Sequence, residues 1–221
     1  MHQQRNAPVS GDERQCGWRL RDAQVIADRY PYTFWKPSVQ LVALLKPGDG
    51  VKLIFDLVAP SEEEPSGERM WLEIIQRNED SFIGRLDSQP RHIADLPRGS
   101  IVSFGPAHII DSSLDDPVPD STLKWQPRCV VTNRIIKHGE KVGFLFREAS
   151  DRPRDSGWRF SCGTESQDYM DDAKNLRVVS LGAVLRVDDR IVSLLDQPAP
   201  IAFEWDEGSQ RFIPTTMPEL E

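Results

Sequence analysis

The chain has 221 residues and a mass of 25.1 kDa, which allows one large domain or two small ones. Its formal net charge of −8 argues against nucleic-acid binding, because such modules need a basic surface that displaces counterions. The start of the chain lacks the apolar core of a signal peptide, and no apolar run is long enough to cross a bilayer. We therefore expect a cytoplasmic protein that binds neither nucleic acid nor membrane.

Three widely spaced cysteines, without a Cys-x-x-Cys motif, predict neither a disulfide framework nor a zinc site. An odd number of thiols without a metal motif favours a reducing compartment. The sequence also contains no glycine-rich phosphate loop, no His-Glu-x-x-His and no Gly-x-Ser-x-Gly. We therefore predict no catalytic, cofactor-binding or metal-binding residues.

Residues 1–20 are polar and without periodicity, so they are expected to form a mobile tail. Residues 21–111 then predict a first α+β domain with two short helices, one over 22–29 and one capped by Ser38 and ended by Lys46-Pro47-Gly48. Alternating apolar residues predict a small, mostly antiparallel sheet in the same domain. Its expected strands cover residues 51–56, 68–77, 82–86, 101–104 and 108–111.

Residues 112–124 combine proline, serine and acids without periodicity, which is typical of a linker. The second domain is predicted over 125–215, again as a mostly antiparallel sheet with one or two short helices, and 216–221 are a tail. Asn133 is expected to cap a short helix. Val142, Phe144 and Phe146 are expected to form the inward face of one strand.

The richest pattern lies between Gly157 and Gly163. Trp158, Phe160 and Cys162 alternate there with polar residues, which predicts a half-buried strand. Serine and threonine caps follow, and then an acidic segment over 168–172 that predicts a short helix or turn.

The second domain resembles the immunity protein 33 family. The resemblance rests on five sequence segments: Cys129–Thr132, Lys141–Glu148, Asp155–Phe160, Tyr169–Asp171, and Leu194–Asp196 ahead of Phe203-Glu204. Members of this family are inferred to be antidotes in bacterial polymorphic toxin systems. The resemblance therefore implies a protein that binds and silences a toxin made by its own cell, and it names no catalytic residues.

A partner surface is predicted where aromatic residues lie beside carboxylates, because these supply anchors and complementarity to a basic toxin. Its residues are Trp158, Asp168, Tyr169, Asp171 and Asp172. The alternative is that Trp158 and Tyr169 lie in the core. The sequence does not decide between a monomer and a weak homodimer.

The first domain resembles the domain of unknown function 2314. The similar segments are Gly48-Asp49, Glu68–Glu73, Phe82–Leu86, Gly99 before Ile101–Phe104, and the closing Ile110-Asp111. This family implies no activity.

Two other functions remain open. The first is a general protein-interaction or housekeeping module. The second is a hydrolase-type enzyme that uses Cys162 or the Asp168, Asp171 and Asp172 cluster. Cys162 lies on the same side of the predicted strand as Trp158 and Phe160, so a role as a small buried apolar residue is the simpler interpretation. The three acids lack the spacing of a calcium-binding loop.

Overall fold

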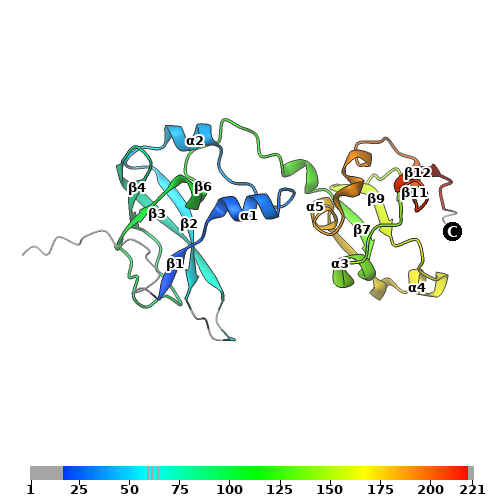
Figure 1. The fold of residues 1–221 in the computed structure, drawn as a ribbon, viewed down its shortest axis with the longest axis horizontal. Helices are drawn as coiled ribbons and strands as arrows, with labels where there is room; N and C mark the ends of the chain where they lie inside the picture. Colours follow the sequence, from blue (N-terminus) through cyan, green and yellow to red (C-terminus); the bar gives the residue numbers. More distant parts are fainter. Residues whose placement is uncertain (1–16, 59, 61, 64, 219–221) are drawn as a thin grey trace, which may run out of the picture. The chain divides into compact units, whose positions relative to one another are not determined.

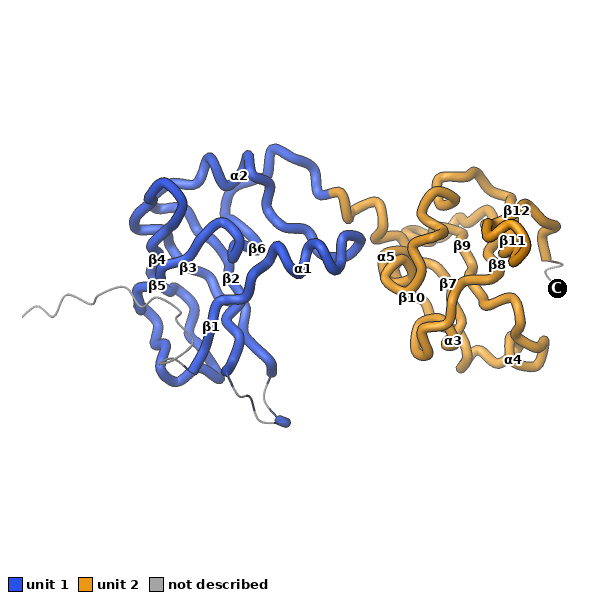
Figure 2. The backbone as a smooth tube through the Cα atoms, in the orientation of Figure 1, with its two compact units in different colours: residues 1–120 blue, residues 121–221 orange. Residues whose placement is uncertain are grey.

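A computed structural model describes residues 17–58, 60, 62–63 and 65–218. The chain divides into two compact units, residues 1–120 and 121–221 (Figure 2). In the described residues, both units consist mainly of strands with a few short helices, which confirms the predicted α+β class (Figure 1). No helix in the described part of the chain is both long enough and apolar enough to cross a membrane.

Unit 1 contains a six-stranded sheet within its described residues, and all its pairings are antiparallel. Strand β2 pairs along one edge with β3 and along the other with β1 and β6. The strands are β1 (Trp18–Leu20), β2 (Gly50–Leu57), β3 (Gly67–Arg77), β4 (Phe82–Leu86), β5 (Ile101–Phe104) and β6 (Ile109–Ser112).

The prediction of a mobile tail over residues 1–20 is wrong for its last residues. Residues 1–16 lie outside the described residues, but Trp18–Leu20 form β1. Trp18 is buried, and the centroid of its ring lies 5.1 Å from that of Phe55 in the core of unit 1. A strand of three residues is too short to show periodicity in a sequence. Burial of the large Trp18 ring nevertheless favours the pairing of β1 with β2.

Two short helices accompany this sheet, α1 (Ala23–Arg29) and α2 (Val39–Leu44), followed later by the 3-10 turn η1 (Pro106–His108). Ser38 caps α2 by accepting a hydrogen bond from the Leu41 amide at 3.0 Å, as predicted. Asp116, in the predicted linker, accepts hydrogen bonds from the Ser38 amide at 2.8 Å and the Ser38 hydroxyl at 2.6 Å. This part of the acidic segment is therefore tied to α2.

Unit 2 contains a second six-stranded sheet in the described residues, in the order β10-β7-β9-β8-β11-β12. Strands β7 and β9 are parallel, and the other neighbours are antiparallel. The strands are β7 (Arg128–Thr132), β8 (Phe144–Arg147), β9 (Asp155–Ser161), β10 (Leu176–Ser180), β11 (Ile201–Asp206) and β12 (Arg211–Thr215).

The helices of unit 2 exceed the one or two predicted. They are α3 (Asn133–His138), α4 (Gln167–Asp171) and α5 (Leu181–Leu185), with the 3-10 turns η2 (Leu123–Trp125), η3 (Ala173–Asn175) and η4 (Asp189–Leu194). Ser166 and Ser180 cap α4 and α5 as their sequence positions predicted. Asn133 does not cap α3. Its buried side chain instead donates to the Lys174 carbonyl at 2.8 Å, and Thr132 occupies the cap position.

One side of this sheet forms the core of unit 2 together with α3, α5 and η4. The buried residues are Cys129, Val131, Leu145, Trp158, Phe160 and Phe203 of the sheet, and Ile135, Leu181, Val184, Leu185, Ile191 and Leu195 of the helices. Of the predicted inward face, Val142 is buried as expected. The prediction is wrong for Phe144 and Phe146, which are half-buried on the other side, because Leu145 faces this core and pairs with Phe160.

Candidate functional site

Among the described residues of unit 2, no layer of helices like that of the core covers the other side of the sheet. Because opposite residues on paired strands share a face, the strand register places one set of side chains there. We call this side the open face. It carries Val130, Phe144, Phe146, Arg159, Ser161, Leu176, Val178 and Glu204.

A hollow of about 570 Å³ lies on the open face. Its apolar lining comes from Val130, Phe144, Phe146 and Leu176 of the sheet and from Met170 of α4, and these side chains are all half-buried. The rings of Phe144 and Phe146 lie 5.9 Å apart, centroid to centroid. Isolated apolar residues on a surface need no explanation, but a hollow with contiguous apolar lining is typical of an interaction site.

The charged centre of the open face is Arg159. Its Nη2 lies 2.6 Å from a Glu148 carboxylate oxygen and 2.8 Å from an Asp155 oxygen. The hydrogen bond from Arg159, together with bonds from the Gly157 amide and Ser150, holds the pKa of Asp155 well below its ordinary value. Arg159 is therefore saturated by carboxylates, and the hollow has no spare cation at its centre.

A second carboxylate, Glu165, lines the hollow on the side of α4. It accepts hydrogen bonds from the Thr132 hydroxyl at 2.8 Å and the Cys162 amide at 2.9 Å. Burial alone would raise the pKa of Glu165, but these hydrogen bonds outweigh it and lower the pKa. Glu165 is therefore ionised at neutral pH, so the margin of the hollow is negative.

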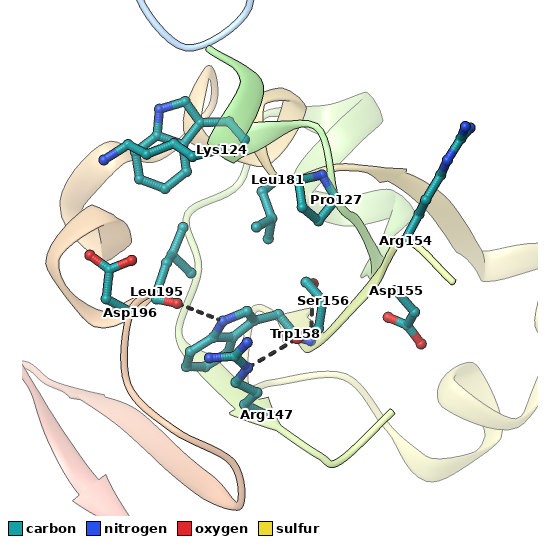
Figure 3. Close-up of a pocket in the computed structure, with 11 residues that line it drawn as sticks. Lys124, Pro127, Arg147, Arg154, Asp155, Ser156, Trp158, Leu181, Leu195 and Asp196 are labelled. Atoms are coloured by element: carbon teal, nitrogen blue, oxygen red, sulfur yellow. Dashed lines mark hydrogen bonds between the residues drawn. The ribbon is translucent and has the colours of Figure 1, made fainter. Parts of the chain in front are cut away.

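Trp158, predicted to contact a partner, is entirely buried. Its indole Nε1 donates to the Leu195 carbonyl at 3.2 Å, and the Arg147 guanidinium lies 5.8 Å from its ring centroid. Figure 3 shows it below a second hollow, of about 490 Å³, that also borders Lys124 and Asp196. This corrects the prediction for Trp158, because a side chain without exposed surface cannot contact a partner. Its expected alternative, a place in the core, holds.

The other four predicted residues lie on or just after α4. Asp168 and Asp171 are exposed on the helix, and Asp172 is exposed at the cap of η3, where it accepts from the Lys174 amide at 2.9 Å. Tyr169 is half-buried and so lies outside the core. Because Met170 of the same helix lines the hollow, α4 forms one margin of the open face.

Comparisons with known proteins agree with one of the two resemblances. Residues 129–214 match the family model described as Immunity protein Imm33 domain. The resemblance predicted for the second domain is thereby confirmed. We call residues 129–214 the Imm33 segment, and all described residues of the open face lie within it. No curated protein and no solved structure matches the chain. The resemblance of the first domain to the domain of unknown function 2314 stays a prediction.

The alternation with Trp158 and Phe160 predicted a buried Cys162. In the structure this residue of the Imm33 segment is only half-buried. Partial burial raises its pKa to about 12, and the nearby Glu165 and Glu140 carboxylates add to the effect. A thiol with this pKa is protonated at neutral pH and is a poor nucleophile. The side chain of His138 is exposed at the end of α3.

No group of three or more His, Cys, Asp or Glu side chains that could hold a metal ion occurs among the described residues. Asp171 instead accepts a hydrogen bond from the side-chain amide of Gln167 at 2.7 Å, and Asp172 caps η3. Asp168, Asp171 and Asp172 are thus exposed groups on α4 and at the turn that follows it.

Sequence reasoning missed the apolar lining of the hollow. Val130, Phe144, Phe146 and Leu176 come from three strands that are not adjacent in the chain, so no single segment displays the surface. One local signal was present. The run Phe144-Leu145-Phe146 is apolar on both parities, which indicates a strand with two apolar faces.

Proposed function

We propose that this protein is a bacterial immunity protein that acts in the cytoplasm and neutralises a cognate polymorphic toxin by direct binding. The observation that carries the proposal is the match of residues 129–214 to the Imm33 domain model. The open face lies in this segment and offers a half-exposed apolar hollow with a negative margin. Such a surface suits recognition of a protein.

A binding mechanism also suits the groups that the enzyme hypothesis would use. A protonated, partly buried Cys162 does not attack a carbonyl or phosphoryl group at useful rates. Glu165 is held by hydrogen bonds to its own unit, so its geometry serves to order the segment between β9 and α4. We therefore infer protection by occlusion or distortion of the toxin, with no bond made or broken by this chain.

The test is co-expression in a laboratory bacterium. The expected toxin is the C-terminal domain of a large secreted protein, to be sought in the genes beside this one, and the readout is colony-forming units after induction. Survival with the full chain, and killing with an unrelated acidic protein of similar size, is the expected result. Equal killing with and without the soluble chain would overturn the proposal and favour a general interaction module.

Direct binding is measured separately. An inactive variant of the same toxin domain is titrated with the purified full chain by calorimetry. We expect a one-to-one complex with a Kd in the nanomolar range or below, since complexes between proteins and their inhibitors at interfaces of ordinary size reach such values. Protection without any complex would contradict neutralisation by binding.

A further inference from the structure

The open face has a chemical character that narrows the part of the toxin it can hold, and the following inference rests on the proposed function. We propose that the hollow on the open face receives a lysine or arginine side chain from the toxin. The aliphatic part of that side chain packs on Phe144, Phe146 and Val130, and its cationic head meets the carboxylates at the margin.

The first argument is the shape and polarity of the hollow. About 570 Å³ is enough for one or two large side chains, and the floor is apolar. Lysine and arginine bury an aliphatic stem while the charged head stays at the polar edge. Phe144 and Phe146 both line the hollow, and aromatic rings attract a cation that lies within about 6 Å of a ring face.

The second argument is charge. Two carboxylates, Glu148 and Asp155, pair with the one guanidinium of Arg159, so this trio keeps a net charge of −1. Glu165 adds a further carboxylate to the lining of the hollow. Glu148 keeps 29 % of its side chain exposed, at the edge of the hollow. An added cation would find a carboxylate there without displacing Arg159, whereas an anion would be repelled.

The third argument is the surrounding field. Glu204 is exposed beside Phe144 on the open face, because these two residues pair between β11 and β8. Asp168 and Asp171 are exposed on α4, the helix whose Met170 lines the hollow, and the whole chain carries −8. Charges of one sign around a hollow raise the rate at which an oppositely charged partner associates.

The test uses two exposed positions on the open face and two matched positions elsewhere in unit 2. Glu204→Lys reverses a charge beside Phe144, and Asp196→Lys makes the same charge change outside the open face. Val178→Lys places a cation next to Val130 on the open face. Leu123→Lys, its matched control, places a cation in η2, outside the open face. Val178 and Leu123 are 63 % and 55 % exposed, so we expect the fold to tolerate both substitutions.

Each full-length variant is titrated with the inactive toxin domain, and its Tm is measured to verify folding. We expect Glu204→Lys and Val178→Lys to raise the Kd at least about tenfold, and the two controls to change it by less than about twofold. A charge-reversed toxin, with one interface lysine or arginine changed to glutamate, should restore binding to Glu204→Lys.

The outcomes separate this inference from the proposed function. If all four variants bind the toxin as the unchanged chain does, the open face is not the docking site, and the inference fails while the immunity function stands. If the unchanged chain neither binds nor protects, the proposed function itself fails. If the chain is a dimer by light scattering and only the open-face variants are monomers, a second copy occupies the hollow, and the inference is again wrong.

Discussion

Arg159 and Asp155 form a forked pair along strand β9, with Nη1 donating to Oδ1 at 3.0 Å and Nη2 donating to Oδ2 at 2.8 Å. Their side chains are only 16 % and 15 % exposed. Planar guanidinium and carboxylate groups match in this geometry, which makes the hydrogen bonds stronger than those of a single-contact pair. The pair fixes the centre of the open face.

The pair predicts acid sensitivity. The pKa of Asp155 is lowered in the folded protein, so the unfolded chain binds more protons as the pH falls below about 4. The stabilisation is therefore complete above about pH 4 and is lost as the pH decreases towards the folded pKa. Asp155→Asn should lower the free energy of unfolding at pH 7 by about 1.5–3 kcal/mol and flatten its decline below pH 4.

Urea unfolding at a series of pH values measures both effects. Asp168→Asn is the matched control, because Asp168 is exposed on α4. An unchanged acid limb in Asp155→Asn would show that the fork contributes nothing to pH dependence.

A second buried carboxylate predicts a larger loss of stability. Asp188 is 1 % exposed and accepts hydrogen bonds from the Val142 amide at 2.9 Å and from Arg190 Nη2 at 2.6 Å. Burial would raise the pKa of Asp188, but Arg190 and Val142 outweigh burial and lower it. Asp188→Ala leaves a cation and an amide without their acceptor, which should cost about 3–5 kcal/mol.

Arg190 also lies 4.0 Å from the centroid of the Trp205 ring. The double variant Asp188→Ala, Arg190→Met should lose less stability than the sum of the two single variants, because each single variant leaves one unpaired charge and the double variant leaves none. Urea unfolding of the three variants, with Asp196→Ala as an exposed control, gives the coupling. Additive losses would contradict a paired role.

Two glycines with similar backbone angles provide a steric test. Gly157 has φ 78° and Gly139 has φ 72°, so alanine is strained at both positions. An added Cβ at Gly157 would overlap the Glu148 carbonyl oxygen, whereas nothing lies within 4 Å of one at Gly139. Gly139→Ala should therefore cost about 1 kcal/mol, and Gly157→Ala about 3 kcal/mol or more. Equal losses in urea unfolding would contradict the close approach of β9 to Glu148.

The sequence was informative where a structural signal is local. Ser38, Ser166 and Ser180 each occupy a helix start and accept a hydrogen bond from the amide three residues later, at 3.0–3.3 Å. These signals need no knowledge of the rest of the fold. The helices and most strands therefore lie where the sequence predicted them.

The sequence was uninformative where a choice depends on distant partners. Leu145 turns inward because β8 pairs with β9 and places it opposite Phe160, and the apolar run around it supports either orientation. Asn133 binds the Lys174 carbonyl, 41 residues away, instead of capping its helix. The open face is hidden from sequence reasoning for the same reason, since β7, β8 and β10 meet only in the folded sheet.

The thiol of Cys162 allows a direct comparison between binding and catalysis. With its pKa raised to about 12, mainly by burial, the thiolate is scarce at pH 8, so iodoacetamide should modify Cys162 at least about a hundredfold more slowly than free cysteine. Peptide mass spectrometry measures this rate separately from those of Cys16 and Cys129.

Since binding needs no thiolate, Cys162→Ala should protect a toxin-expressing cell as well as the unchanged chain does. Rapid alkylation of Cys162, joined with loss of protection in a folded Cys162→Ala protein, would instead assign the chain a reactive thiol and a chemical role.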